Sequence, residues 1–269
     1  MQSQLIFLGT GTSSLVIGSQ ARASGGLVLQ TDGFQFHIDP GPGALVRARQ
    51  FNVNPRENTA VFVTHNHLSH CNDINAVISA MTHAGEDKKG VLVCNKTLYE
   101  GHEDLEPYLT KHHRDYLERT IVLNTGQKVG IEEIEVHAIK AIHSDPHTIG
   151  LKFITPKFTL VYSSDTKFDE SILEDYKNAD ILVLNNVCPF SVKGNNNLNS
   201  EDTVEIINAV KPKIAVIQHF GVKMLAADPL YEAREIKKQT NIPIIAAKDG
   251  MAINPITFSS SFCQKAFDV

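Results

Sequence analysis

The sequence predicts an α/β protein in which two β-sheets pack together with helices on the outside. Short apolar runs rich in Val and Ile recur along the whole chain and are bounded by Gly, Pro, Asn or Asp, which is typical of buried strands. Amphipathic helical patterns lie between the later runs. The first 65 residues contain many such runs but few helical patterns, which favours two packed sheets over one doubly wound parallel sheet.

The expected elements alternate along the chain. Apolar residues at helical spacing predict the helices, and Ser200 with Thr203 resembles a capping sequence at the start of one of them. Helices are expected at residues 73–81, 97–119, 200–210 and 228–240, and strands at residues 5–8, 26–29, 34–38, 60–63, 91–93, 121–123, 134–139, 158–162, 181–184, 214–217 and 242–246.

Length and composition predict a globular chain with a large core. The protein has 269 residues, a mass of 29.6 kDa, a hydrophobic fraction of 42% and a net charge of −5. These values exclude a disordered or collagen-like chain. Because no repeat, low-complexity tract or linker interrupts the sequence, we expect a single domain over residues 1–269.

The sequence carries no targeting signal that we recognise. No window approaches the ~18 apolar residues of a membrane span, and the first residues do not form a signal peptide. The four cysteines are widely spaced and do not suggest a disulfide framework. We therefore expect a cytoplasmic protein with no membrane partner.

The sharpest feature is the segment THNHLSH at residues 64–70, which directly follows an apolar run. Residues two apart in an extended segment point the same way, so His65 and His67 can converge on one point. His70 falls where the next helix should begin. Imidazole is a good ligand for zinc and similar transition metals, and three imidazoles this close together are hard to explain by packing. The segment therefore predicts a metal site.

Three later polar side chains follow apolar runs in the same way: His143, Asp165 and His219. Functional groups gather in loops at one edge of a sheet, so we expect these three to join the histidine cluster. Six other histidines lack this context and are expected to be ordinary core or surface residues, and His147 is left undecided. The six are His37, His83, His102, His112, His113 and His137.

These residues resemble the metallo-β-lactamase superfamily. Its first metal motif is HxHxDH, followed by a distant His, a bridging Asp and a final His. The segments FLGTGT and HIDPGPG look like the family's N-terminal strand and its Asp-containing turn. HIDPGPGAL, HSDPHTIG and QHFGVKML are most similar to uncharacterised archaeal-type members. The resemblance covers nearly the whole chain and implies a four-layer αββα sandwich with a one- or two-metal site at one edge.

The resemblance also implies a role for each matching residue. Asp165 would bridge two metal ions and take part in catalysis, and Asp39 would tether the histidine segment by hydrogen bonds. His147 is retained as a further catalytic candidate. The implied ligands are His65, His67 and His143 for the first metal, and His70, Asp165 and His219 for the second.

One position departs from the family pattern. Ser69 stands where the family has the Asp that ligates the second metal and orients the nucleophile, and a protonated hydroxyl is a poor ligand. Three outcomes are open. In the first, the second metal site is weak or empty. Alternatively, Asp73 completes it, since Asp73 lies one turn after His70 on the expected helix. The third alternative is that the chain has lost hydrolysis and kept the fold. Related archaeal-type sequences tend to have a His near residues 197–198, where this chain has asparagines at residues 195–197. The change could remove a substrate-binding or proton-donating group, but we interpret the asparagines as a surface loop.

We expect a metal-dependent hydrolase. A bound metal lowers the pKa of water from 15.7 towards about 7, so a metal-bound hydroxide would attack an electrophilic phosphorus or carbonyl. The segments YSSDT and FLGTGTSS are similar to the phosphodiesterase branch of the family, which includes ribonuclease Z. There is no long basic insertion that could grip a tRNA, and the net charge is −5. A small phosphodiester or nucleotide is therefore the expected substrate, and extended nucleic acid is not.

Zinc is the expected cofactor, one or two ions per chain, with Mn²⁺ and Fe²⁺ as alternatives. A homodimer is expected only because homodimers are the commonest oligomers. Two other enzyme classes remain open on this fold, a lactone or thioester hydrolase and a mono-iron redox enzyme. A non-catalytic, metal-stabilised binding protein is a further alternative because of Ser69.

Overall fold

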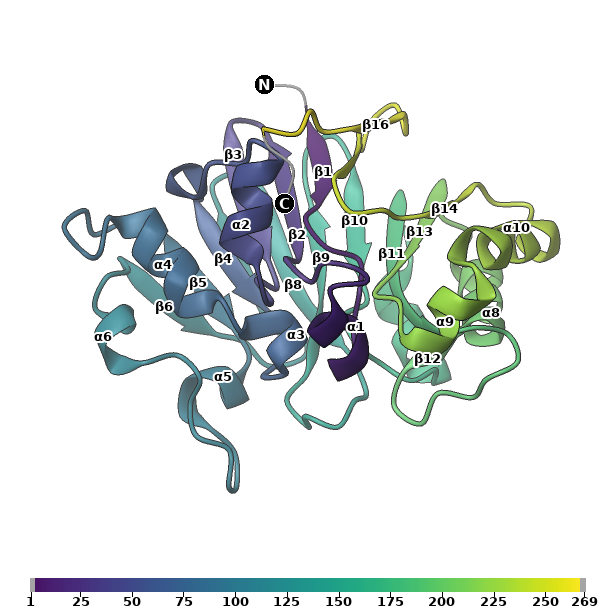
Figure 1. The fold of residues 1–269 in the computed structure, drawn as a ribbon, viewed down its shortest axis with the longest axis horizontal. Coiled ribbons are helices and arrows are strands. Elements are labelled where there is room, and N and C mark those ends of the chain that lie inside the picture. Colours follow the sequence, from purple (N-terminus) through teal and green to yellow (C-terminus); the bar gives the residue numbers. More distant parts are fainter. Residues whose placement is uncertain (1–2, 267–269) are drawn as a thin grey trace. The chain divides into compact units, whose positions relative to one another are not determined.

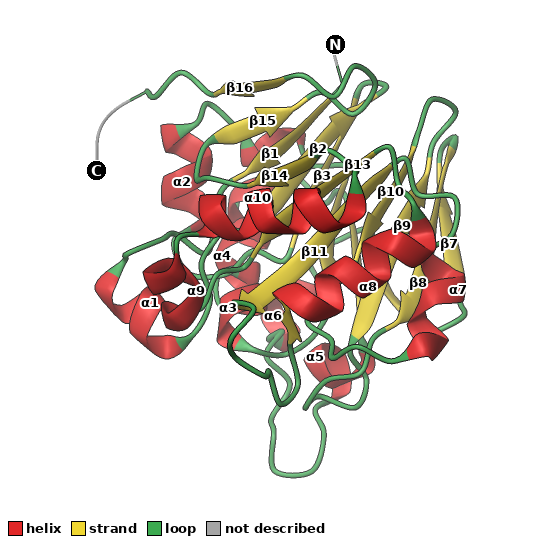
Figure 2. Ribbon diagram, turned by 90° about the vertical axis from the view of Figure 1, so that its right-hand side faces the viewer, coloured by secondary structure: helices red, strands yellow, loops and turns green. Residues whose placement is uncertain are grey.

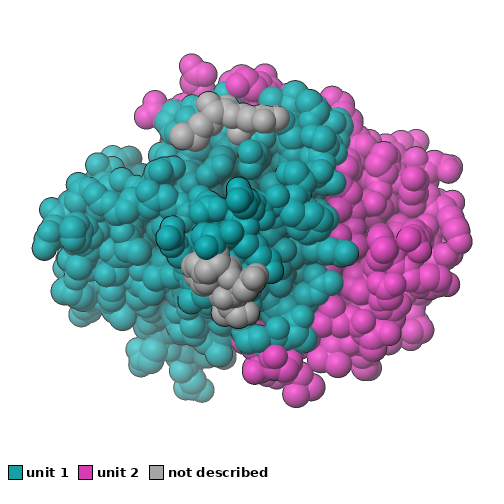
Figure 3. Space-filling view, turned by 45° about the horizontal axis from the view of Figure 1, so that its top comes forward, with its two compact units in different colours: residues 1–10, 20–123, 248–269 teal, residues 11–19, 124–247 magenta. Residues whose placement is uncertain are grey.

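The computed structural model describes residues 3–266 and contains two multi-stranded β-sheets with helices (Figure 1). The chain forms two compact units, coloured separately in Figure 3. The first unit comprises residues 1–10, 20–123 and 248–269, and the second comprises residues 11–19 and 124–247. The single domain over residues 1–269 stays a prediction. Within the described part of the chain, no helix combines the length and the apolar character that a bilayer span needs.

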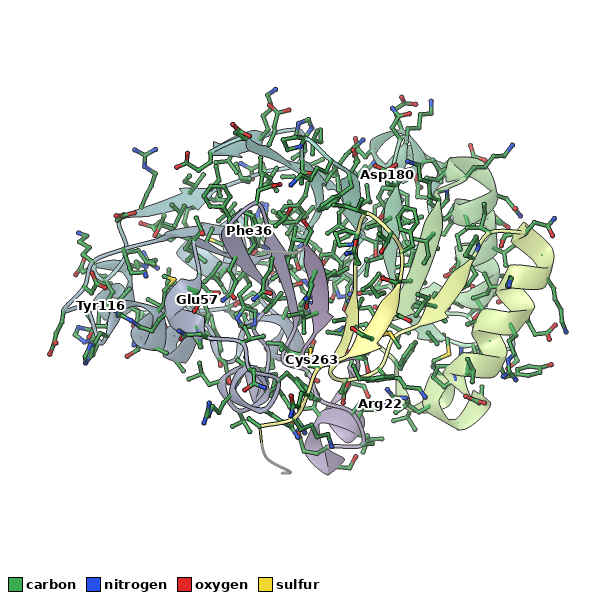
Figure 4. The ribbon with its side chains drawn as sticks, turned by 90° about the horizontal axis from the view of Figure 1, so that it is seen from above. Arg22, Phe36, Glu57, Tyr116, Asp180 and Cys263 are labelled. Atoms are coloured by element: carbon green, nitrogen blue, oxygen red, sulfur yellow. The ribbon has the colours of Figure 1, made fainter. Side chains whose placement is uncertain are left out.

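The first unit is built on a mixed eight-stranded sheet. In sheet order its strands are β16 (Ser260–Phe262), β15 (Met251–Ile253), β1 (Gln4–Phe7), β2 (Leu27–Thr31), β3 (Phe34–Ile38), β4 (Ala60–Val63), β5 (Val91–Cys94) and β6 (Arg119–Val122). Strands β3 to β6 run parallel to one another, and the other pairs are antiparallel. Phe36 of β3, labelled in Figure 4, is fully buried and lies edge-on to Phe62 of β4, with ring centroids 5.9 Å apart.

The helices of the first unit are short. They are α2 (Ala44–Gln50), η1 (Pro55–Glu57), α3 (Leu68–Cys71), α4 (Ile74–Thr82), α5 (Lys96–Glu100) and α6 (Lys111–Arg114). Helix α4 has the amphipathic spacing that the sequence predicts: Ile74, Val77 and Ile78 are fully buried in one core cluster with Val61 and Leu92 of the sheet. Burial of this apolar face, rather than helix length, stabilises α4.

The second unit contains the other sheet, which is also mixed. In sheet order its strands are β14 (Ile244–Ala246), β13 (Ile214–Gln218), β11 (Ile181–Cys188), β10 (Thr159–Tyr162), β9 (Ile149–Ile154), β8 (Ile134–Lys140) and β7 (Lys128–Ile131), and β12 (Leu198–Asn199) pairs with β11. Strands β10, β11, β13 and β14 are parallel. At their starting edge, Asp180 (labelled in Figure 4) accepts a hydrogen bond of 2.7 Å from the N–H of Thr159.

The helices of the second unit include the two longest of the described residues. They are α1 (Ser14–Ser19), η2 (Glu170–Ile172), α7 (Leu173–Tyr176), α8 (Ser200–Val210), α9 (Val222–Ala227) and α10 (Pro229–Thr240). Helices α8 and α10 lie side by side against this sheet (Figure 2). Asp228 caps α10 by accepting from the N–H of Leu230, and Pro229 occupies the first helical position, where its missing N–H costs nothing.

The predicted α/β fold class is confirmed, and two local predictions are wrong. The expected helix over residues 97–119 is broken into α5, a loop and α6, because Gly101 has φ 82° and ends α5 in a conformation that other residues avoid. The cap of α8 lies one residue earlier than expected: Asn199 and Asp202 form a reciprocal capping box. Strands β7, β9, β12, β15 and β16 are not among the predicted ones.

Candidate metal centre

The histidine segment of the first unit begins where the buried strand β4 ends. His65 is fully buried, His67 is half-buried, and His65 Nε2 lies 3.1 Å from His67 Nδ1. His70 follows on α3, is buried, and its ring centroid lies 4.0 Å from that of His65. The structure therefore brings the three histidines of this segment together, as their spacing predicts.

Asp39 ties this segment in place. Its Oδ1 accepts from the N–H of Thr64, and its Oδ2 accepts from the Thr64 hydroxyl and from His70 Nδ1, each at 2.8 Å. Because the Thr64 hydroxyl gives its proton to Asp39, it accepts from Nδ1 of His65 at 3.1 Å. The Nε2 atoms of His65 and His70 then carry the lone pairs that a metal requires. The expected tethering role of Asp39 is confirmed.

The Asp-containing turn packs directly on the histidine segment. A Cβ atom at Gly41 would lie 2.1 Å from the carbonyl oxygen of Ser69, so only glycine fits this close approach. The N–H of Asp73 donates to the carbonyl of Pro40 at 3.0 Å. Asp39 itself has φ 53°, a left-handed conformation that Asp tolerates better than most residues. The turn and α3 thus form one tightly fitted unit.

Asp73 lies at the junction between two helices rather than within a helix that continues from His70. Helix α3 ends at Cys71 and α4 begins at Ile74, so Asp73 is the residue before α4. Its carboxylate accepts from Nδ2 of Asn72 at 2.9 Å. Ser69 is half-buried on α3. The role of Asp73 as a substitute for the missing motif carboxylate stays a prediction.

In the second unit, Asp165 lies between two histidines. Its Oδ2 is 3.7 Å from His143 Nε2 and its Oδ1 is 3.2 Å from His219 Nε2. The side chains of His143, Asp165 and His219 are only 5%, 6% and 8% exposed. The three residues follow β8, β10 and β13, as predicted. His219 and the neighbouring Ser164 both have left-handed backbone, at φ 63° and 56°, which is typical of functional positions held by their surroundings.

Two further residues of this centre are missing from the sequence prediction. Asn185, buried on β11, donates from Nδ2 to Asp165 Oδ1 at 2.7 Å. Its own Oδ1 accepts from Nε2 of Gln218 at 2.8 Å. This chain of amides fixes the rotation of the Asp165 carboxylate. The signal that could have found Asn185 is an amide pair directly after the apolar run at residues 181–184.

The loop of His143 is fixed from both sides. His143 Nδ1 donates to the backbone carbonyl of Asn196 at 2.7 Å, so Nε2, which faces Asp165, carries the lone pair. The N–H of Ile142 donates to the hydroxyl of Thr166 at 2.9 Å, which ties this loop to the one that carries Asp165. Residues 195–197 are a loop, as expected, but a carbonyl of that loop takes part in the centre.

His147 is half-buried in the loop after His143, and its N–H donates to Asp145 Oδ1 at 2.9 Å. Its catalytic role stays a prediction. His37 is a core histidine: its Nε2 donates to the carbonyl of Gly25 at 2.9 Å, and burial lowers the pKa of the ring below its usual value. His137 pairs with Glu135 at 2.5 Å near the surface. These two follow the expectation of ordinary roles.

The chemistry of the donor sets fits divalent metal. All six predicted ligands belong to groups of His and Asp side chains that could hold a metal ion. Two nitrogen ligands on one tetrahedral zinc, each at about 2.0–2.1 Å, lie roughly 3.3 Å apart. The 3.1 Å between the ring nitrogens of His65 and His67 is close to this value. Neutral imidazoles and one carboxylate suit zinc and similar transition metals.

Comparison with known proteins identifies the family. Residues 35–220 match the β-lactamase superfamily domain, and the chain belongs to the metallo-β-lactamase superfamily. An uncharacterised protein of Methanocaldococcus jannaschii is 32% identical over 255 residues, which covers 94% of this chain and 95% of that protein. The resemblance to uncharacterised archaeal-type members is therefore confirmed.

Solved structures share the fold at low identity. The metallo-β-lactamase fold protein YhfI from Bacillus subtilis has a TM-score of 0.76 at 18% identity and covers 94% of this chain and 99% of its own. The short form of human tRNase Z has a TM-score of 0.67 at 17% identity, with coverages of 93% and 98%. A diphosphatase of the PhnP family has a TM-score of 0.67 at 18% identity, with coverages of 94% and 97%. These similarities show the metallo-β-lactamase fold, which is that of metallo-hydrolases.

Proposed function

We propose that this protein is a metal-dependent hydrolase that acts on a small phosphodiester or a nucleotide. The observation that carries the proposal is that three of the candidate ligands, His65, His70 and His143, each have the ring oriented by a hydrogen bond at Nδ1, which leaves Nε2 for a metal. In this proposal the ligands are those that the family resemblance implies: His65, His67 and His143 for the first ion, and His70, His219 and the bridging Asp165 for the second.

A bound divalent ion would supply a nucleophile by lowering the pKa of water and would stabilise negative charge on a phosphoryl oxygen. The protein's own part is positioning. Asp39 keeps the Nε2 lone pair of His70 available, and the Asn196 carbonyl does the same for His143. Asn185 fixes the carboxylate of Asp165 by its hydrogen bond. His147 and Asp73 are proposed to assist catalysis.

One feature favours attack at phosphorus and another favours a small substrate. Neighbours in fold include a tRNase and a diphosphatase, which favours a phosphorus centre as the electrophile. The chain is acidic, with a net charge of −5, and a long polyanion is bound mainly through many basic contacts. A phosphodiester with few charges needs no such surface.

The test is hydrolysis of bis-p-nitrophenyl phosphate with added Zn²⁺ or Mn²⁺, together with metal content by elemental analysis. We expect at least one metal per chain, and activity that falls at least a hundredfold in His67→Ala. His137→Ala is the matched control, because His137 pairs with Glu135 and belongs to neither donor set. Less than one metal per chain, with no effect of His67→Ala on metal content, would refute the proposal.

The same assay separates the alternatives. Activity on lactones or thioesters but not on phosphodiesters would assign the carbonyl branch, and native iron with oxygen consumption would assign a redox enzyme. Silence on every substrate, with metal bound, would support a non-catalytic protein in which Ser69 replaces the motif carboxylate. Light scattering tests the proposed homodimer.

A further inference from the structure

One buried carboxylate holds both ends of the loop between β11 and α8. Glu232 lies on α10 and is only 4% exposed. Its Oε2 accepts from the N–H of Phe190, at the start of the loop, at 3.0 Å, and from the hydroxyl of Ser200, the first residue of α8, at 2.5 Å. A carboxylate buried this deeply is costly unless donors satisfy it, so the two hydrogen bonds fix the loop on α10. Figure 2 shows α8 and α10 side by side.

The loop between these two anchors is itself tightly folded. Nδ2 of Asn199 donates to the carbonyl of Val192 at 3.2 Å. A Cβ atom at Gly194 would lie 2.1 Å from the carbonyl oxygen of Asn197, so the turn needs glycine. A loop with both ends fixed and a tight internal turn has little freedom to move its peptide groups.

The tip of this loop reaches the centre. The Asn196 carbonyl accepts from His143 Nδ1 at 2.7 Å, and on the other side of the ring Nε2 faces Asp165. An acceptor at Nδ1 selects the neutral tautomer whose proton is on Nδ1 and whose lone pair is on Nε2. If the loop shifted, the ring would lose this bias, since a neutral imidazole can carry its proton on either nitrogen.

We propose that Glu232 is a positioning residue for His143. By clamping Phe190 and Ser200, it holds the Asn196 carbonyl at the place where it selects the tautomer of the His143 ring. Glu232 acts only through the loop and does not touch the reacting groups. The inference rests on the proposed function in one respect, namely that His143 is a metal ligand.

The test compares Glu232→Leu with Glu232→Gln. Leucine keeps the bulk and removes both acceptors, whereas the glutamine oxygen can still accept from both donors. The first readout is the ¹⁵N spectrum of the imidazole rings in metal-free protein at alkaline pH, with the His143 signals assigned by a His143→Gln variant. The second readout is zinc affinity by competition with a chelator. Glu235→Gln is the matched control, because Glu235 lies on the same helix, is half-buried and pairs with Lys238.

In Glu232→Leu we expect the His143 ring to become a mixture of tautomers and zinc affinity to fall about tenfold, at the lower end of the effect of outer-shell substitutions. Glu232→Gln and Glu235→Gln should keep the wild-type ring spectrum and affinity. A folded Glu232→Leu protein with wild-type ring spectrum and affinity would overturn the proposal.

The proposal can still be tested if Glu232→Leu does not fold or if wild-type protein binds no zinc. Should Glu232→Leu not fold, Ser200→Ala removes one of the two donors, and an unchanged His143 spectrum in that variant would overturn the clamp. If wild-type protein binds no zinc, the proposed function fails, but the ring spectrum of metal-free protein still decides whether Glu232 positions His143. The two failures are therefore distinguishable.

Discussion

The substitution Asp39→Asn separates the stability of this protein from its metal affinity. Asp39 accepts three hydrogen bonds at 2.8 Å, two from Thr64 and one from His70 Nδ1. An asparagine has the same shape but only one acceptor oxygen. Its NH₂ group must face donors that Asp39 satisfies, and each such donor loses its partner unless it can become an acceptor.

Asp39 Oδ2 accepts from the Thr64 hydroxyl and from His70 Nδ1, and both groups can become acceptors in the metal-free protein. The hydroxyl can rotate, and the His70 ring can move its proton from Nδ1 to Nε2, so we expect the free energy of unfolding to fall by only about 1–2 kcal/mol. Metal binding needs Nε2 unprotonated and returns the proton to Nδ1, where it faces the amide. An unsatisfied buried donor costs about 1–3 kcal/mol, so metal at His70 should bind roughly tenfold to a hundredfold more weakly.

Urea unfolding of metal-free protein measures the first quantity, and chelator competition with Zn²⁺ measures the second. Asp249→Asn is the matched control, since Asp249 also accepts three hydrogen bonds, from Thr10 and Ala23, but none from an imidazole. It should lose at least as much stability, because the backbone N–H groups of Thr10 and Ala23 cannot become acceptors, and it should keep wild-type affinity. If Asp39→Asn binds two zinc ions as tightly as wild type, the reasoning about the His70 tautomer is wrong.

Three further predictions follow from single contacts. Ser69→Asp should raise zinc content towards two per chain by elemental analysis, and an unchanged content would mean that another group, such as Asp73, already serves that position. His37 has a pKa below its ordinary 6.5 because it is buried. As the pH falls, the unfolded chain therefore takes up a proton on His37 before the folded protein does. The contribution of neutral His37 to the free energy of unfolding is complete above about pH 6.5 and decreases below that pH. Between pH 7.5 and 5.5, the free energy of unfolding from urea titrations should decrease more steeply in wild type than in His37→Gln, by up to about 1.4 kcal/mol per pH unit. The same pH dependence in both proteins would contradict this. Asn185→Leu leaves Gln218 and Asp165 without a partner amide and should lower the urea-derived free energy of unfolding by about 2–4 kcal/mol, so a loss below about 0.5 kcal/mol would count against the role of Asn185.

Much of the fold could be predicted because buried strands leave a local signal. Apolar runs correctly indicated β4, β8, β10 and β13, and these are the strands that the six candidate ligands follow. Strands with polar or alternating residues, such as β7 and the exposed β16, left no such signal. The predicted helix over residues 97–119 failed because its composition suits a helix, whereas the backbone at Gly101 does not.

The candidate site divides in the same way. His65, His67 and His70 lie close in sequence, so their spacing alone indicated a shared purpose. Asp39 is 25 residues from Thr64 and 31 from His70, and only the family resemblance suggested the contact. Asn185 and Gln218 are 33 residues apart, and nothing in the sequence links either to Asp165.

The sequence by itself determined the class of fold, the family and the identity of the six ligand candidates, because hydrophobic periodicity and residue type are properties of the chain. The tertiary structure decided how those ligands are oriented. The Asn196 carbonyl that accepts from His143 is a backbone group, which every residue possesses. No residue type in the sequence could therefore predict this hydrogen bond. In the sequence Glu232 is one more charged residue of an amphipathic helix. Only the packing of α10 beside α8 buries its carboxylate, so that Oε2 accepts hydrogen bonds from two donors.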